Sequence, residues 1–242
     1  MKTTRTQNLL VAAAILVFAL TAGSSTSAPT GTPERRDLAA IKAEQAALTP
    51  AQVLESLRLG NERFASGKTK SRDMLHDQRT TTGGQYPHAV ILSCIDSRAP
   101  AEIILDTGIG ETFTARVAGN IANDDLLGSL EFACAVAGAK LILVMGHTAC
   151  GAIKGAIDGA ELGHLTGLLE KIKPSVVATS YTGERVSKNY AFVDAVAKTN
   201  VIHTVAAIRG QSSVLANLEK DGKIKIVGSM YHLEGGRVEI LS

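Results

Sequence analysis

The alternation of apolar and polar stretches along the chain predicts a series of buried strands. Residues 89–92 and 141–145 are uninterrupted apolar runs, and each is followed by Ser or Gly. This pattern is typical of parallel strands that are buried on both faces of a sheet. Two more runs flank Gly235-Gly236 and predict a hairpin near the end of the chain. The predicted strands are residues 88–93, 112–117, 140–145, 225–231 and 237–241.

Helical spacing of apolar residues fills the segments between these strands. One helix is expected to start at Asp124 or Asp125 as N-cap and to end at Gly138. The other helices of this part are expected over residues 149–157, residues 162–172 with an end near Pro174, and residues 190–218. Because strands and helices alternate, we expect an α/β fold with a mainly parallel β-sheet, right-handed crossovers and flanking helices.

Two further helices are predicted ahead of the sheet. The first lies within residues 33–48, where Leu38, Ile41 and Leu48 form a stripe at helical spacing that includes one polar residue, Gln45. A capping box then starts the second, with the sequence Thr49-Pro50-Ala51-Gln52, and its apolar face continues to Gly67. Neither helix has a partner strand of its own, so we interpret residues 29–68 as an N-terminal arm that packs on a second subunit. Residues 69–242 form the α/β body, in one domain with the arm, and begin with a polar, irregular stretch over residues 68–84.

The start of the chain has the pattern of a secretory signal peptide. Lys2 and Arg5 precede an apolar run over residues 9–22, and small residues follow at 23–28. The apolar run is shorter than the roughly 20 residues that span a bilayer, so we expect no stable membrane insertion. We therefore predict that about residues 1–28 are removed, although the sequence does not determine which bond is cleaved. The mature protein is expected to be periplasmic or secreted.

Composition narrows the possible partners. The chain of 242 residues is 45% hydrophobic with a net charge of +2, which falls to zero once the two basic leader residues are removed. A single globular domain without a nucleic-acid partner is expected. Three cysteines, Cys94, Cys134 and Cys150, do not make an even disulfide framework. Cys134 lies among alanines and is expected to be a small buried side chain.

Two short motifs follow two of the apolar runs. Cys94-x-Asp96-x-Arg98 follows the first, and Gly146-His147-x-x-Cys150-Gly151 follows the other. The carboxyl ends of parallel strands share one edge of a sheet, so these side chains should converge. Thiolate sulfur and imidazole nitrogen are ligands that zinc prefers. We therefore predict one Zn²⁺ per chain, bound by Cys94, His147 and Cys150.

The fourth zinc position has two possible occupants. Asp96 and Arg98 are spaced to form a planar carboxylate–guanidinium pair. If Arg98 holds Asp96 away from the metal, the position is open to water. If Asp96 turns onto the metal, it becomes a fourth ligand and the site is closed.

Together these motifs resemble the β-class carbonic anhydrases, in an exported bacterial form. The likeness covers about residues 54–231 and includes Gly60-Asn61-x-Arg63-Phe64 and Arg116-x-Ala118-Gly119-Asn120. Val117 stands where many members of the family carry Asn.

The resemblance implies an activity and several residue roles. The activity is zinc-dependent, reversible hydration of carbon dioxide to bicarbonate and a proton through a zinc-bound hydroxide. Cys94, His147 and Cys150 correspond to the zinc ligands, and Asp96 with Arg98 corresponds to the catalytic dyad. The implied substrate pocket includes Gln85, Phe113, Phe132 and Gly151. Members of the family are usually assemblies, so a homodimer or homotetramer is expected.

Two alternatives stay open at the level of sequence. A related enzyme with the same zinc site could hydrolyse an analogue of carbon dioxide such as carbon disulfide. A non-catalytic zinc protein would keep Asp96 as a permanent fourth ligand. The proton shuttle is also undetermined, with five candidates at His76, His88, His164, His203 and His232.

Overall fold

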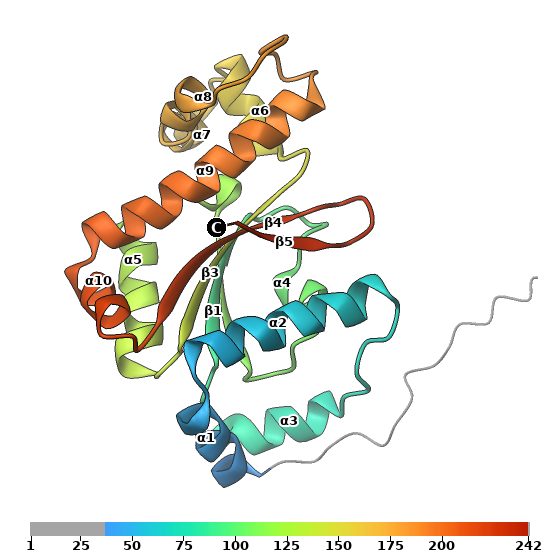
Figure 1. The fold of residues 1–242 in the computed structure, drawn as a ribbon, viewed down its shortest axis with the longest axis vertical. Coiled ribbons are helices and arrows are strands. Elements are labelled where there is room, and N and C mark those ends of the chain that lie inside the picture. The colour runs from blue at the N-terminus through green and yellow to red at the C-terminus, as the bar shows by residue number, and fades with distance from the viewer. Residues whose placement is uncertain (1–36, 242) are drawn as a thin grey trace, which may run out of the picture.

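The computed structural model describes residues 37–241, which fold around one sheet of five strands (Figure 1). The strands lie in the order β2-β1-β3-β4-β5, and only the last pairing is antiparallel. Their bounds are β1 Ala89–Ser93, β2 Thr112–Arg116, β3 Leu141–His147, β4 Lys225–Tyr231 and β5 Val238–Leu241. The predicted α/β fold with a mainly parallel sheet is confirmed. The leader predicted over residues 1–28 and the start of the arm lie outside the described residues.

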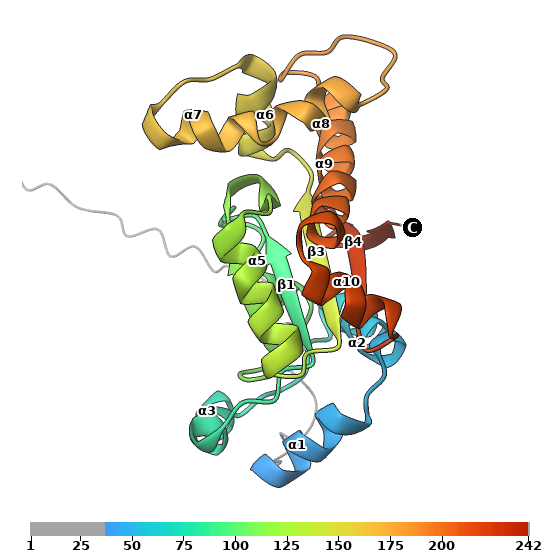
Figure 2. The same ribbon diagram turned by 90° about the vertical axis from the view of Figure 1, so that its left-hand side faces the viewer.

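Helices cover both faces of this sheet (Figures 1 and 2). In Figure 1, α6, α7 and α8 lie together at the top of the molecule, beyond the end of β3. The helices are α1 Leu38–Ala47, α2 Pro50–Ala65, α3 Met74–Thr80, α4 Ala101–Ile104, α5 Asp124–Glu131, α6 Gly151–Asp158, α7 Gly163–Glu170, α8 Lys173–Ala178, α9 Tyr190–Gln211 and α10 Ser213–Lys220.

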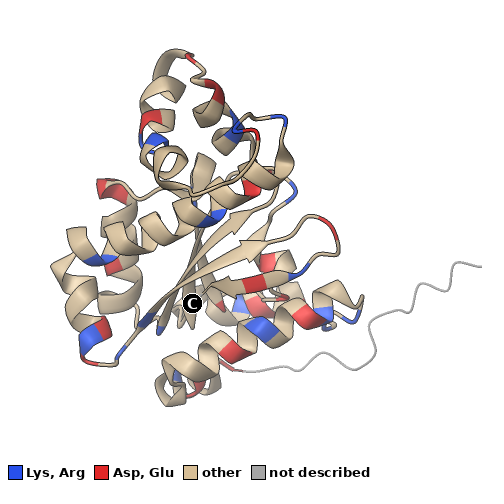
Figure 3. Cartoon of the chain, turned by 45° about the horizontal axis from the view of Figure 1, so that its top comes forward, with Lys and Arg blue, Asp and Glu red and all other residues tan. Residues whose placement is uncertain are grey.

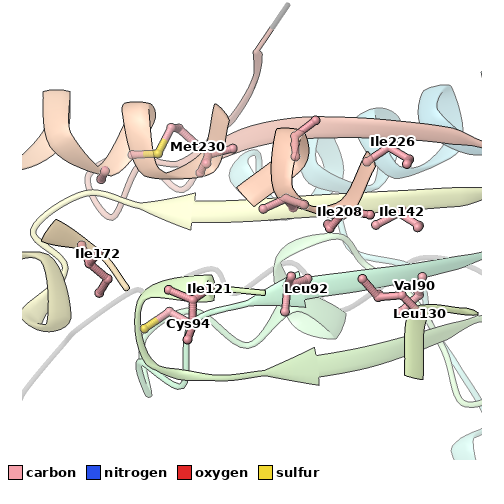
Figure 4. Packing of buried hydrophobic residues seen from close by; sticks show 14 of the residues in the cluster. Val90, Leu92, Cys94, Ile121, Leu130, Ile142, Ile172, Ile208, Ile226 and Met230 are labelled. Carbon is pink, nitrogen blue, oxygen red and sulfur yellow. The ribbon is translucent and has the colours of Figure 1, made fainter. Parts of the chain in front are cut away.

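The period-two alternation of the central strands sends side chains into two separate cores. Val90 and Leu92 of β1 pack in one cluster with Leu130 of α5 and Ile208 of α9 (Figure 4). On the other face, Ile91 belongs to a second cluster that includes residues of α2 and α4. Because both faces are covered, β1 and β3 are buried along their whole length, as their continuous apolar sequences predict.

The second N-terminal helix packs on the sheet of its own chain, which corrects the expectation that it lacks a partner there. The predicted capping box at Thr49 and Gln52 is present at the start of α2. Val53 and Leu57 of this helix are buried in the second core cluster, beside Leu141 and Leu143 of β3. Contact between the arm and a second subunit stays a prediction.

Gln45, the polar residue on the α1 stripe, is buried and hydrogen-bonded. Its Nε2 donates to the carbonyl oxygens of Pro87 at 2.7 Å and Ala137 at 2.8 Å. The amide therefore ties α1 to the start of β1 and to the segment before β3, without leaving a buried polar group unpaired.

Several element boundaries differ from the sequence predictions. The stretch expected to be irregular contains α3 and a 3₁₀ turn, Thr81–Gly83. The N-cap of α5 is Asn123, whose side chain accepts from Leu126 N at 2.9 Å, so neither Asp124 nor Asp125 has this role. After Glu131 the helix continues as a π-helix, Phe132–Val136.

Helix breaks in the last third of the chain also differ from expectation. The helix predicted over residues 162–172 is α7, which ends at Glu170 ahead of Pro174, and Pro174 lies in the first turn of the next helix, α8, where its missing N–H costs nothing. The long helix expected over residues 190–218 is two helices. Ser212 separates them, and its side chain accepts a hydrogen bond from Leu215 N at 3.1 Å to cap α10.

Helix α9 packs in the core of the fold, although its length and composition would also suit a membrane span. Among the described residues it is the one helix long and apolar enough to cross a membrane. Val193, Val196 and Val201 of this helix are fully buried, in the core cluster to which residues of β3 and β4 also belong.

Acidic and basic residues are interspersed over the outer helices in the view of Figure 3. The charge distribution in that view is mixed, which agrees with the small net charge.

Candidate metal centre

The two motifs meet at the carboxyl edge of the central strands. Cys94 directly follows β1, and His147 is the last residue of β3. Ser93 is in register with Met145 on the neighbouring strand, so the residues that follow both strands lie at the same edge of the sheet. Cys150 is the N-cap of α6, which begins immediately after the short turn that leaves β3.

The three side chains form a compact group of ligand atoms. The two sulfurs and a ring nitrogen of His147 all lie within 4.8 Å of one another, and all three residues are buried. The Sγ atoms of Cys94 and Cys150 are 4.0 Å apart. Two thiolates on a tetrahedral zinc, with Zn–S bonds of roughly 2.3 Å, would be about 3.8 Å apart. The spacing of the sulfurs therefore fits a shared metal ion.

The orientation of His147 also fits a metal ligand. Its Nδ1 lies 2.9 Å from the carbonyl oxygen of Thr148, which can only accept, so Nδ1 carries the hydrogen. Nε2 is then a bare lone pair, and within the described part of the chain this buried atom has no hydrogen-bond partner. A buried polar atom without a partner calls for an explanation, and a metal ion would supply one.

The electrostatics of the group favour a thiolate at Cys94. The hydrogen bond with the Cys150 thiol lowers the pKa of Cys94, and the same contact, together with burial, raises the pKa of Cys150. Burial alone would lower the pKa of His147, but its interaction with Cys94 raises that pKa on balance. The negative charge is therefore favoured on the Cys94 sulfur, and a thiolate is the form of cysteine that binds a metal.

Arg98 holds the carboxylate of Asp96 beside the three ligands. Nε and Nη2 of Arg98 donate to Oδ1 and Oδ2 of Asp96 at 2.9 Å and 2.8 Å, and the Arg98 backbone N–H donates to Oδ1 at 2.9 Å. The hydrogen bonds from Arg98 hold the pKa of Asp96 well below its usual range. Oδ2 lies 3.8 Å from Nε2 of His147. The carboxylate is thus next to the metal-ligand group while both of its oxygens are engaged by Arg98.

Several residues that support these loops were not assigned a role from the sequence. Arg116, the last residue of β2, donates from Nε to Cys94 O at 2.8 Å and from Nη2 to Asp96 O at 2.6 Å. Asp194 of α9 accepts from the backbone N–H of Ala149, a non-glycine residue with a φ of 55°. Arg116 belongs to a family motif, which could have drawn attention to it. Asp194 had no local signal, because its partner is 45 residues away.

The structure brings one of the four predicted pocket residues to the metal-ligand group. Gly151 begins α6 directly after Cys150. Phe113 and Phe132 lie together, with ring centroids 6.1 Å apart, but they line a separate groove of about 650 Å³ with Val90 and residues of α5. Gln85 precedes the start of β1, whereas Cys94 follows its end. The length of the strand separates these two residues within one chain.

The remaining thiol and two of the candidate histidines have structural partners. Cys134 is buried in the π-helix, as expected for a small apolar side chain, and burial raises its pKa to about 12. Nε2 of His232 lies 3.0 Å from Glu239, and Nδ1 of His203 lies 3.0 Å from the Ser175 hydroxyl. The structure therefore singles out neither histidine as a proton shuttle.

Comparison with known proteins agrees with this site. Residues 89–238 match the family described as carbonic anhydrase. Carbonic anhydrase 2 of Mycobacterium tuberculosis is 36% identical over 194 residues, covering 78% of this chain and 91% of that protein. A carbonic anhydrase of Mycolicibacterium smegmatis is 35% identical over 199 residues, covering 80% and 94%.

The fold comparison leads to the same class. The crystal structure of the β-carbonic anhydrase CafA of Aspergillus fumigatus superposes with a TM-score of 0.62 at 27% identity, covering 68% of this chain and 80% of that one. A Coccomyxa β-carbonic anhydrase gives the same TM-score of 0.62 at 22% identity, covering 79% and 85%. The ligand group, the paired Asp and Arg beside it and these similarities all indicate one family, and the chain belongs to the β-class carbonic anhydrases.

Proposed function

We propose that this carbonic anhydrase uses one zinc ion per chain to hydrate carbon dioxide reversibly, giving bicarbonate and a proton. The observation that carries the proposal is the buried group of Cys94, His147 and Cys150, with the Asp96 carboxylate at its side. The two sulfurs and the unpartnered Nε2 are the donor set that zinc prefers. Bound zinc would act as a Lewis acid that makes water a stronger acid and hence a nucleophile near neutral pH.

The protein residues around the metal would control the proton and the orientation of water. Because Asp96 is ionised, a carboxylate oxygen can accept a hydrogen bond from the attacking water and fix its direction. Arg98 keeps this carboxylate oriented through two side-chain hydrogen bonds. It would also prevent Asp96 from occupying the position that the reaction needs. This arrangement supports the open form of the site over a permanently closed, non-catalytic one.

The central test combines a metal measurement with a rate measurement. Cys150→Ser removes one sulfur from the ligand group, so zinc content and carbon dioxide hydration should both fall to background. Cys134→Ser is the matched control, because it also replaces a buried thiol but lies in the π-helix outside the ligand group. It should keep both properties. Stoichiometric zinc in Cys150→Ser would contradict the ligand assignment, and a zinc-loaded wild type that hydrolyses carbon disulfide but does not hydrate carbon dioxide would contradict the substrate.

We propose further that the protein works as a homodimer or homotetramer. Gln85 precedes β1 and Cys94 follows it, so a role of Gln85 in the substrate pocket would be played at the site of a second subunit. Strand β2 is an edge strand, and the groove beside it exposes Phe132, whose relative exposure is 48%. Edge strands and apolar grooves are surfaces that subunit contacts cover. The β-carbonic anhydrases of Sordaria macrospora with a similar fold are described as tetrameric.

The assembly is tested by light scattering coupled to size-exclusion chromatography. Wild type should elute with the mass of two or four chains, whereas Phe132→Asp should shift the population toward monomer. Leu75→Asp, at another exposed apolar residue on α3, is the control and should leave the mass unchanged. A monomeric wild type at micromolar concentration would contradict the proposal.

Export to the periplasm, with loss of residues 1–28 or nearly so, is the corresponding proposal for location. Its support is the charged start and short apolar run of the sequence. N-terminal sequencing of protein from the periplasmic fraction should give a start between about residues 23 and 32, the span of small residues where such leaders are cut. Soluble cytoplasmic protein that retains Met1 would contradict it.

A further inference from the structure

A chain of hydrogen bonds leads from the Cys94 sulfur through the interior to a histidine at a separate cavity. Gly119 N lies 3.4 Å from Cys94 Sγ, and the Gly119 carbonyl oxygen accepts from Asn200 Nδ2 at 2.7 Å. Oδ1 of Asn200 lies 3.3 Å from the Ser175 hydroxyl, which in turn lies 3.0 Å from Nδ1 of His203. Four residues thus connect a metal-ligand candidate to helices α8 and α9.

The donors in this chain all point toward the sulfur. Asn200 uses its amide hydrogen on Gly119, so its oxygen is left as an acceptor, and the one hydroxyl hydrogen of Ser175 must serve it. Ser175 can then only accept from His203, which fixes the hydrogen of that ring on Nδ1. Hydrogen bonds aligned in one direction polarise one another. Polarisation in this direction strengthens the hydrogen bond on the Gly119 carbonyl, and Gly119 then presents its N–H to the Cys94 sulfur.

The backbone at Gly119 leaves little freedom for another arrangement. Its φ is +70°, and a Cβ atom there would meet Cδ1 of Ile172 at 2.5 Å. Glycine is thus required both by the backbone conformation and by the lack of space. Asn200 is 2% exposed and Ser175 is 1% exposed, so water cannot readily replace either partner. Without the Asn200 amide, the Gly119 carbonyl would lose this hydrogen bond in a buried setting.

The hydrogen-bond chain ends at His203, which lies at a second cavity. His203 lines a cavity of about 580 Å³ together with Lys171, Thr204 and Gln211. Asn200 lines it too, so this amide separates the cavity from the turn that contacts Cys94. None of the residues that line this cavity is one of the three candidate ligands, so the hydrogen-bond chain links Cys94 to a separate part of the molecule.

We propose that Asn200 is a positioning residue for the metal centre. Its hydrogen bond holds the carbonyl that follows the Gly119 Cα, and so helps to fix the backbone conformation that aims the Gly119 N–H at the Cys94 sulfur. Ser175 with His203 holds the Asn200 amide in the orientation that this requires. A hydrogen bond to a thiolate withdraws charge from the sulfur, so the chain would set how strongly Cys94 donates to the metal. This inference rests on the proposed assignment of Cys94 as a zinc ligand.

Two variants and one matched control test the chain. Asn200→Leu keeps a similar volume and removes the amide, and Ser175→Ala breaks the chain one link farther from the sulfur. Thr204→Val is the control, because Thr204 is buried one turn along α9 in the same cavity and takes no part in the chain. Zinc affinity is measured by competition with a chelator. The sulfur-to-metal charge-transfer band is recorded on cobalt-substituted protein.

The expected result is graded. Asn200→Leu should weaken zinc binding by about ten-fold, the lower end of the range for residues that support a metal ligand. The cause is the loss of positioning of Cys94, which outweighs the stronger donation by its sulfur. The cobalt band of Asn200→Leu should move to longer wavelength, because a thiolate without its hydrogen bond gives up an electron more easily. Ser175→Ala should show a smaller change in the same direction, and Thr204→Val should match wild type. If Asn200→Leu does not fold, the Ser175→Ala result decides.

Three outcomes would overturn the inference. A wild-type band and affinity in folded Asn200→Leu or Ser175→Ala would show that the chain does not act on the metal centre. An equal change in Thr204→Val would show a general packing effect. A wild type that takes up no metal through Cys94 would overturn the proposed function, and this inference with it. The first two outcomes leave zinc binding by wild type intact, so the two failures are distinguishable.

Discussion

Two pairs of aspartate and arginine lie in different surroundings in this protein. The Asp96 carboxylate at the candidate metal centre is contacted by one arginine, Arg98, whose side chain is 56% exposed. Asp106, at the end of α4, has a side chain that is 5% exposed. It accepts from Arg63 at 2.5 Å and from Arg72 at 2.9 Å, and the backbone N–H of Lys70 also contacts both carboxylate oxygens.

The sequence around the buried pair explains why it is fixed. A Cβ atom on Gly60 would meet the Leu105 carbonyl oxygen at 1.9 Å, so only glycine lets α2 approach this loop closely. Asn61 then donates to Ile104 O at 3.2 Å and accepts from Val238 N at 2.8 Å. The motif that contains Arg63 therefore holds α2 against α4 and β5 through hydrogen bonds.

The difference teaches what separates a structural ion pair from a functional one. A buried carboxylate with several donors has no alternative partner, and breaking its contacts leaves buried charge. A carboxylate with one exposed arginine can exchange partners at low cost. The same two residue types thus stabilise the fold in one place and, under the proposed function, would regulate access to a metal in the other. Four predictions test this contrast.

The largest effect is expected on stability from Asp106→Asn. The variant keeps the shape of the side chain but removes the counter-charge of Arg63 and the nearer of the two that face Arg72, which keeps Glu111 at 3.5 Å. Loss of one partner of a buried ion pair costs about 3 kcal/mol or more. For a chain of this size that lowers the midpoint of thermal unfolding by roughly 10 °C. Calorimetry measures this midpoint, and kcat/KM of the folded fraction should stay near wild type. Lost activity with unchanged stability would reverse the assignment of the two pairs.

Arg98→Ala should produce the opposite profile. Removing the guanidinium frees Asp96 to compete for the metal, so zinc stays bound while turnover falls by about 10- to 100-fold, as for other residues that orient metal-site groups. An exposed ion pair contributes less than about 1 kcal/mol, so the unfolding midpoint should barely move. Rate, zinc content and calorimetry are measured on one preparation. Asp96→Asn is the companion variant and should keep an open position but lose proton handling. Wild-type turnover in Arg98→Ala would remove the gating role.

The pH profile should show a smaller, several-fold effect. Arg98 lowers the pKa of Asp96, so this carboxylate is ionised throughout pH 6.5–9, a range chosen to bracket neutrality. The stability it contributes is present above the ordinary pKa near 4 and is lost only as pH falls through the lower folded value. Activity should still rise with pH, because two thiolates donate more charge to zinc than imidazoles would and make the water it activates a weaker acid. A flat profile at full zinc occupancy would contradict this.

The smallest effect is expected from Arg58→Ala on the surface of α2. Arg58 pairs with Glu55 and Glu62, but its side chain is 43% exposed. Solvent and salt screen such pairs, so neither the unfolding midpoint nor the rate should change measurably. The same assays at low and physiological salt provide the check. A loss comparable with that of Asp106→Asn would show that burial does not decide the strength of these pairs.

The sequence predicted the central strands and the convergence of Cys94, His147 and Cys150 because both signals are local. Uninterrupted apolar runs report burial on both faces, and the strand ends fix where Cys94 and His147 lie. Boundaries set by competition between neighbouring caps were less accurate. Asn123 caps α5 although two aspartates follow it, and Ser212 interrupts what reads as one helix. In each case a single side-chain hydrogen bond decides between positions that the apolar pattern treats alike.

By itself, then, the sequence determined which candidate ligands gather at the strand ends, the alternation of strands and helices, and the family. Only the tertiary structure decided which partners support those residues. Asn200 meets Gly119 across 81 positions of the chain, and Asp194 meets Ala149 across 45. The period of apolar positions indicates which face of a helix or strand is buried. The choice of partner depends instead on how whole helices pack against the sheet, and no local spacing encodes that packing.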